Sequence, residues 1–189
     1  MSDSYFWPMQ EGINEVIATT RFHAAPMGII CRDERVMMAV FRTSHTAVLI
    51  EETGMVVANI IHDPVLFVRT AFSDLESAEL TEFEVADTKV CRLSCADSWV
   101  VYRSRIEQKT ELKLLVRLDP VQIILTQTTM TPINRGLNSI IEASVHGTRY
   151  VNTRDPDLKQ LIDHHVDLVK RCGGERELLA LRLLLEYIG

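Results

Sequence analysis

Apolar and polar residues alternate in short runs through the first two thirds of the chain, a pattern typical of antiparallel strands. We expect strands over residues 13–20, 25–31, 36–42, 55–61, 99–106 and 112–125. The charged residues 32–35 predict a hairpin connection. In the last run, Leu112, Leu114, Val116 and Leu118 alternate with polar residues and predict one buried and one exposed face. The pattern favours the wall of a β-barrel.

Two short helices are predicted between these strands. Thr43-Ser44 offers N-cap hydroxyls, and Gly54 can end the helix that follows in a left-handed conformation. Asp63-Pro64 joins a good N-cap to a residue preset for the first helical position, which predicts a second helix to about residue 72.

After residue 129 the period of apolar residues changes to about 3.6 and keeps that value to the end of the chain. Thr131-Pro132 and Asp155-Pro156 each predict a helix start, and Gly173-Gly174 precedes a third helix over residues 175–188. Leucines surround this third helix almost completely. Such a helix requires burial on more than one side, in a helical cluster or across a dimer interface.

Length and charge narrow the classes of function. The 189 residues can bury a substantial core, and we expect a barrel domain over residues 1–129 and a helical region over residues 130–189. A net charge of −6 repels polyphosphates, so nucleic acid is not an expected partner. The opening MSDSYFWPMQ lacks a secretory signal, and the apolar runs are too short to span a bilayer. These features predict a cytoplasmic protein without membrane attachment.

Residues 41–46 form the most informative stretch, because a strand is predicted to end there and a helix to begin. Free N–H groups at a helix N-terminus attract anions, and Arg42 adds a bidentate phosphate donor. Thr43, Ser44 and Thr46 bring hydroxyls to the same turn. The turn is a candidate phosphate site. Plain N-capping by Thr43 or Ser44, which needs no ligand, explains the same residues.

A second candidate segment covers residues 23–28. Small residues and a proline at a strand start leave backbone groups uncovered, so a flat ring system can lie against them. Gly28 within the strand indicates close approach by another backbone or a ligand. The alternative is a tight entry to an ordinary strand.

Polar residues also follow one face of the first C-terminal helix. They are Asn134, Asn138, Glu142 and His146 at four-residue spacing, with Arg135 and Arg149 alongside. A solvated face with ion pairs is one explanation. The other is a lid that presents Asn134, Arg135 or Glu142 to a bound ring or to substrate.

No metal site is predicted. His164 and His165 are adjacent on a helix and point about 100° apart, so they cannot readily share one ion. Cys31, Cys91, Cys95 and Cys172 are too scattered for a zinc site and are expected to be reduced thiols. The chain has no Ser/His/Asp hydrolase motif, Walker loop or GxGxxG motif, so we assign no catalytic residue.

Several short motifs together resemble a known family. In the N-terminal part they are Ile13-Asn14-Glu15-Val16, Thr19-Thr20, Ala24-Ala25-Pro26-Met27-Gly28, Phe41-Arg42, Thr46 and Val57-Ala58-Asn59-Ile60. In the C-terminal part they are Asn134-Arg135-Gly136, Ile141-Glu142-Ala143 and Thr148-Arg149. These motifs are similar to those of uncharacterised, largely archaeal proteins of the FMN-binding split-barrel superfamily, relatives of flavin reductases, with a helical C-terminal extension.

The resemblance implies a split β-barrel followed by a three-helix region, and a homodimer that holds FMN between its subunits. It places the isoalloxazine along the strand after His23 and the phosphate near residues 42–46. The implied cofactor-binding residues are His23, Ala25, Pro26, Met27, Arg42, Thr43, Ser44, Thr46, Asn59, Asn134 and Arg135. His23 departs from the family pattern, since relatives more often carry Asn there, although His can also donate a hydrogen bond.

The function implied is that of a flavin-dependent oxidoreductase or flavin reductase acting on a small substrate. A flavin protein needs no side-chain nucleophile, because the ring carries the redox chemistry. Two alternatives stay open: a non-catalytic flavin-binding, storage or sensing protein, and a deazaflavin-dependent reductase in the same groove.

Overall fold

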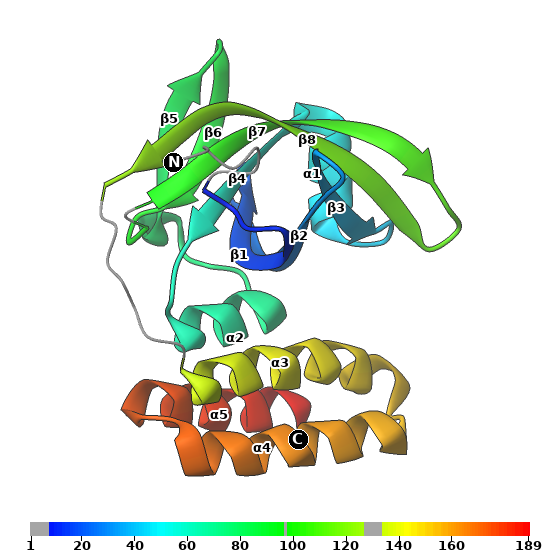
Figure 1. The fold of residues 1–189 in the computed structure, drawn as a ribbon, viewed down its shortest axis with the longest axis vertical. Helices are drawn as coiled ribbons and strands as arrows, with labels where there is room; N and C mark the ends of the chain where they lie inside the picture. The colour runs from blue at the N-terminus through cyan, green and yellow to red at the C-terminus, as the bar shows by residue number, and fades with distance from the viewer. Residues whose placement is uncertain (1–7, 97, 127–133) are drawn as a thin grey trace. The chain divides into compact units, whose positions relative to one another are not determined.

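The computed structural model describes residues 8–96, 98–126 and 134–189. The chain divides into two compact units (Figure 1), one made of residues 1–61 and 75–128 and the other of residues 62–74 and 129–189. The first unit is mainly β and the second is helical. The chain therefore enters the helical unit twice, because residues 62–74 belong to it as well as the C-terminal region.

Six strands of the first unit close into a barrel in the order β1-β2-β3-β8-β7-β4. Their bounds are Gly12–Thr20 for β1, His23–Arg32 for β2, Arg35–Phe41 for β3, Met55–Ile60 for β4, Ser98–Lys109 for β7 and Lys113–Leu125 for β8. All neighbouring pairs are antiparallel, and pairing of β1 with β4 completes the barrel. The predicted barrel with a helical C-terminal part is confirmed.

Local signals explain most of the turns of this unit. The predicted hairpin connection at residues 32–35 is confirmed: Asp33 and Glu34 join β2 to β3 with φ values of 50° and 55°, as a two-residue type I′ turn requires. Helix α1, His45–Thr53, begins after the N-cap Ser44 and ends at Gly54, whose φ of 62° is left-handed. This helix is also as predicted.

The barrel core comes from alternate positions on the strands. Leu114, Val116 and Leu118 of β8 are buried, as their alternation predicts. Leu112 breaks the predicted pattern, because it precedes β8 and is 73% exposed. A separate two-stranded sheet, β5 (Leu80–Val85) with β6 (Thr88–Leu93), follows the short helix η1 (Ser77–Glu79).

The helical unit packs four helices around one apolar core. They are α2 (Pro64–Phe72), α3 (Arg135–Thr153), α4 (Pro156–Cys172) and α5 (Glu175–Ile188). Ile140, Ile162 and Leu184 are completely buried between them. None of the helices in the described part of the chain has the length and apolar character needed to cross a membrane.

Three helices of this unit were predicted to start at N-cap residues, and two of the three predictions are confirmed. Asp63 and Asp155 cap α2 and α4 as predicted, each accepting a hydrogen bond from the amide two residues later. The predicted start of α3 was wrong in position: its N-cap is Asn134, whose side chain accepts from the Gly136 and Leu137 amides. Thr131-Pro132 lie outside the described residues.

We expect Gly136→Ala to destabilise the helical unit, although alanine is the better helix former by about 1 kcal/mol. A Cβ at this position would lie 2.5 Å from the Cα and 2.8 Å from the N of Gly173. Both atoms are backbone and cannot rotate away, so the first turn of α3 and the end of α4 would have to separate. Urea unfolding followed by circular dichroism should show a loss of about 2 kcal/mol. Equal or greater stability of the variant would contradict this close approach.

Candidate functional site

The turn between β3 and α1 carries four of the predicted site residues, and part of it forms an N-cap without a ligand. The Ser44 hydroxyl donates to the Phe41 carbonyl at 2.8 Å and accepts from the Ala47 amide at 3.2 Å. Thr46 is buried, whereas the Arg42 and Thr43 side chains are exposed. Ser44 therefore does the structural capping that the sequence offered as the ligand-free explanation.

The same turn keeps free donors. Among the described residues, the His45 and Thr46 amides at the start of α1 have no hydrogen-bond partner. These amides and the positive end of the helix dipole favour an anion. Arg42 donates one guanidinium hydrogen bond to the Thr110 carbonyl at 3.1 Å, which holds the side chain beside the turn and leaves further N–H groups available. The turn can thus receive a phosphate.

The first half of β2 presents an open strand edge. β2 pairs with β1 over His23–Cys31, but it pairs with β3 only from Ile29 to Arg32. Residues 23–28 therefore have a strand neighbour on one side only. Ala25, Pro26 and Met27, the predicted ring contacts, lie in this segment and are half-buried.

The open edge and the phosphate turn meet at their ends. The imidazole of His23 lies against that of His45, with ring centroids 5.6 Å apart in an edge-on arrangement. Thr20, which pairs with His23 across the β1–β2 turn, is 2% exposed, and its hydroxyl has no hydrogen-bond partner among the described residues. The fold thus brings together the two segments that the sequence singled out separately, and a buried polar group lies beside them.

Gly28 has a different explanation from the predicted one. A Cβ at Gly28 would lie 2.9 Å from the Ile13 Cγ2 and 3.2 Å from a Glu15 carboxylate oxygen. Side chains of β1 fill this space, where we had expected a backbone or a ligand. Gly28 is therefore needed for packing between β1 and β2.

Asn59 is completely buried and its amide is occupied by protein groups. Its Nδ2 donates to the Ile17 carbonyl at 2.8 Å and to the Thr19 hydroxyl at 3.1 Å. Its Oδ1 accepts from the Leu93 amide at 2.9 Å, which ties β6 to the barrel. Contact with a ligand would require these bonds to break, so the geometry gives Asn59 a structural role.

Asn134 and Arg135 belong to the helical unit. The side-chain Oδ1 of Asn134 caps α3 by accepting from the Gly136 and Leu137 amides, and its Nδ2 donates to Glu177 of α5 at 3.3 Å. Its side chain therefore serves the helix start and the α3–α5 contact. Arg135 is exposed at the first position of α3.

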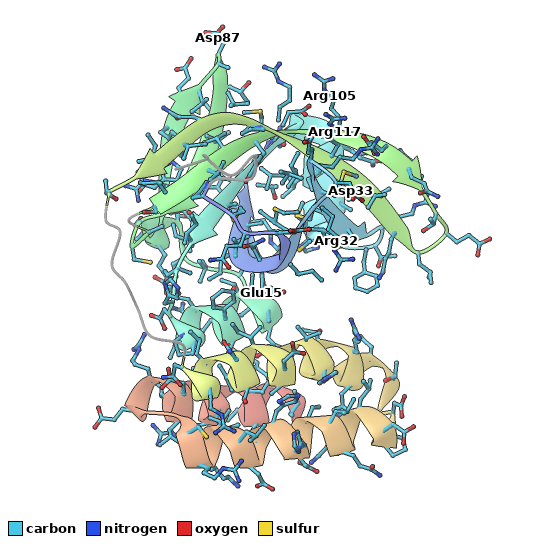
Figure 2. All side chains as sticks on the ribbon, in the orientation of Figure 1. Glu15, Arg32, Asp33, Asp87, Arg105 and Arg117 are labelled. Carbon is cyan, nitrogen blue, oxygen red and sulfur yellow. The ribbon has the colours of Figure 1, made fainter. Side chains whose placement is uncertain are left out.

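Sequence reasoning missed a cationic hollow on β7 and β8. Its volume is about 600 Å³, and it is lined by Arg103, Arg105, Ile106, Glu107, Arg117, Asp119, Pro120 and Val121. Arg105 and Arg117 face each other across the two strands (Figure 2), and both pair with Asp119, at 3.4 Å and 3.1 Å. Charged residues two apart on each strand of a hairpin share a face, and this spacing is the signal that could have revealed the hollow.

The four cysteines are free thiols, as predicted. Cys31 and Cys91 are buried, and burial raises the pKa of both thiols. A raised pKa lowers the thiolate fraction, so these two groups are poor nucleophiles.

Comparison with known proteins adds two kinds of finding. The chain matches two family models, "Protein of unknown function (DUF447) N-terminal domain" over residues 14–127 and "Protein of unknown function (DUF447)" over residues 134–186. It is similar to the crystal structure of the FMN-bound protein MM1853 from Methanosarcina mazei, with 35% identity, 94% of this chain and 96% of that chain covered, and a TM-score of 0.88.

Two further solved structures are more distant. One is the 2-nitrobenzoate 2-nitroreductase NbaA of Pseudomonas fluorescens, 16% identical over 62% of this chain and 66% of that chain, with a TM-score of 0.48. The other is an FMN-binding protein from Thermus thermophilus, 10% identical over 64% of this chain and 74% of that chain, with a TM-score of 0.46.

Proposed function

This chain belongs to the DUF447 family, and from that premise we propose that it binds FMN, with the phosphate at the turn between β3 and α1. The observation that carries the proposal is the donor set of this turn: two unpartnered amides at the N-terminus of α1, with Arg42 held beside them. The FMN-bound state of the 35% identical protein from Methanosarcina mazei supports the same cofactor. A phosphate dianion matches these donors in charge.

The isoalloxazine would lie along the open edge of β2, at residues 23–28. Backbone groups on an edge without a strand neighbour can hydrogen bond to a polar ring edge, and Ala25, Pro26 and Met27 offer a flat, partly apolar surface. His23 contacts His45 of the phosphate turn, and Thr20 pairs with His23 across the β1–β2 turn, so both could orient the ribityl chain or the ring. The bound flavin would supply hydride or electron transfer, and the protein would position it.

We further propose that two copies of the chain form a homodimer across this site. Large apolar side chains are exposed around the phosphate turn: Phe22 is 58%, Phe41 50% and Leu112 73% exposed. Leu112 lies beside the turn, because its carbonyl accepts from the Arg42 amide at 3.0 Å. Exposed apolar groups gathered at one site favour association. Sedimentation velocity would measure the mass in solution, and a monomer at all concentrations would contradict the dimer.

The activity we propose is that of a flavin-dependent oxidoreductase or flavin reductase for a small substrate. The described residues of the site offer mainly backbone donors, a guanidinium and two imidazoles, which suit the orientation of a ring better than attack on a substrate. A flavin-storing or sensing protein would use the same groups to bind without turnover. A deazaflavin in the same groove is the other alternative.

We expect the purified protein to carry the visible absorption of oxidised flavin, and mass spectrometry of the released cofactor to identify FMN. Anaerobic addition of NADH or NADPH should then bleach this absorption within seconds to minutes. A deazaflavin mass would support the deazaflavin reading. FMN that no donor reduces would support the storage protein, and a colourless protein that does not take up FMN would refute the proposal.

A further inference from the structure

Three side chains of the helical unit gather between α3 and α4, in a place that the proposed flavin site does not use. Glu142 and His146 are one helical turn apart on α3, and His165 lies on α4. One ligand atom of each, a carboxylate oxygen or an imidazole nitrogen, lies within 4.8 Å of the other two. The imidazole rings of His146 and His165 stack with centroids 5.8 Å apart.

Each of the two imidazoles has a buried nitrogen atom without a hydrogen-bond partner among the described residues. These atoms are the Nδ1 of His146 and the Nδ1 of His165. Buried polar atoms are almost always bonded, so two unpartnered nitrogen atoms on neighbouring rings point to a missing ligand. A neutral imidazole binds a metal ion through a ring nitrogen.

We propose that Glu142, His146 and His165 bind a divalent first-row transition-metal ion, with Zn²⁺ as the representative, and so clamp α3 to α4. Two imidazoles and a carboxylate are a donor set that zinc uses, with the fourth position filled by water. Bonds of about 2.0–2.1 Å place tetrahedral ligand atoms about 3.4 Å apart. The ligand atoms lie within 4.8 Å of one another, so they need to close by up to about 1.4 Å, and the exposed side chain of Glu142 is free to rotate.

The sequence hides this site, because its histidines lie 19 positions apart in the chain. The rings of His164 and His165 meet edge-on, with centroids 5.3 Å apart. The partner of His165 is His146 on the neighbouring helix, and Glu142 lies four residues before it. His164 is exposed and outside the cluster, which makes it a matched control.

The test is calorimetric titration of ZnCl2 into the full chain, with any purification tag removed and prior treatment with a chelator. We expect one equivalent to bind with a dissociation constant in the micromolar range or below. His146→Gln and His165→Gln should each weaken binding by about 100-fold or more. His164→Gln should bind as the wild type does. Because Glu142 is exposed, Glu142→Gln should fold normally and weaken binding by about 10-fold.

A second measurement is the thermal unfolding midpoint with and without Zn²⁺, since a ligand of the native state stabilises it by mass action. The midpoint should rise with Zn²⁺ in the wild type and in His164→Gln, and stay constant in His165→Gln. The proposal fails if the wild type binds no Zn²⁺ at micromolar concentrations. It also fails if Glu142→Gln and His165→Gln bind as tightly as the wild type, or if His164→Gln loses as much affinity as His165→Gln.

Discussion

Arg42→Ala is expected to weaken FMN binding by about 10- to 100-fold, the loss of one or two charge-assisted hydrogen bonds to a phosphate. Riboflavin has the same ring and no phosphate, so its affinity should change by less than about threefold if Arg42 contacts only the phosphate. Quenching of flavin fluorescence on titration with flavin-free protein measures both affinities. The difference between the two ligands separates a phosphate contact from a general loss of structure.

Arg32→Ala is the matched control for this experiment. Arg32 is an exposed arginine at the end of β2 opposite to His23, beside the hairpin at Asp33 (Figure 2). Its removal changes the net charge by the same amount as Arg42→Ala, and it should leave FMN affinity unchanged. If the two variants lose FMN equally, the effect is long-range electrostatics. If Arg42→Ala loses FMN and riboflavin equally, Arg42 does not hold the phosphate.

Asn59→Ala should destabilise the barrel unit by about 3 kcal/mol, because it removes a buried amide side chain together with its hydrogen bonds to three buried groups. The Ile17 carbonyl, the Thr19 hydroxyl and the Leu93 amide would all lose a hydrogen bond. The link between β6 and the barrel would weaken with them. Urea unfolding followed by tryptophan fluorescence reports this unit, because both tryptophans of the chain, Trp7 and Trp99, fall within its residue ranges.

Gln122→Ala provides the comparison, since Gln122 is an exposed amide on β8 of the same barrel. Gln122→Ala should change the free energy of unfolding by no more than about 0.5 kcal/mol. Unfolding of Asn59→Ala, together with a titration of its FMN binding, decides between two roles for Asn59. A variant that keeps its stability but loses FMN would make Asn59 a cofactor ligand, as the sequence resemblance implied, and would rule out the structural role argued from its hydrogen bonds.

Elements with local signals could be predicted from the sequence. Asp63 and Asp155 start helices because cap and proline are adjacent, and Gly54 ends one because its conformation needs no distant partner. The hairpin at Asp33 and Glu34 and the alternation on β8 are equally local. The turn between β3 and α1, at residues 41–46, was also predicted from local signals.

Features that depend on distant partners could not be predicted. Asn134 starts α3 partly through its contact with Glu177, 43 positions later. A glycine is needed at position 28 because the side chains of Ile13 and Glu15, on the neighbouring strand, fill the space of a Cβ. No local pattern reveals this contact. The contact of His165 with His146 could not be predicted, because His146 lies on another helix and only His164 is adjacent in the chain. The open edge of β2 could not be predicted either, because it depends on the register in which β2 pairs with β3.

The double entry of the chain into the helical unit limits how this protein can be divided. A fragment that stopped after β8 would still carry α2, and the Val65 and Val68 side chains that α2 packs against α3 and α5 would face water. The complementary fragment from residue 134 would lack the same helix and keep a gap in its core. Neither unit is encoded by one continuous segment of the chain. To express the helical unit separately, or to fuse it to another protein, α2 has to be joined to the fragment from residue 134.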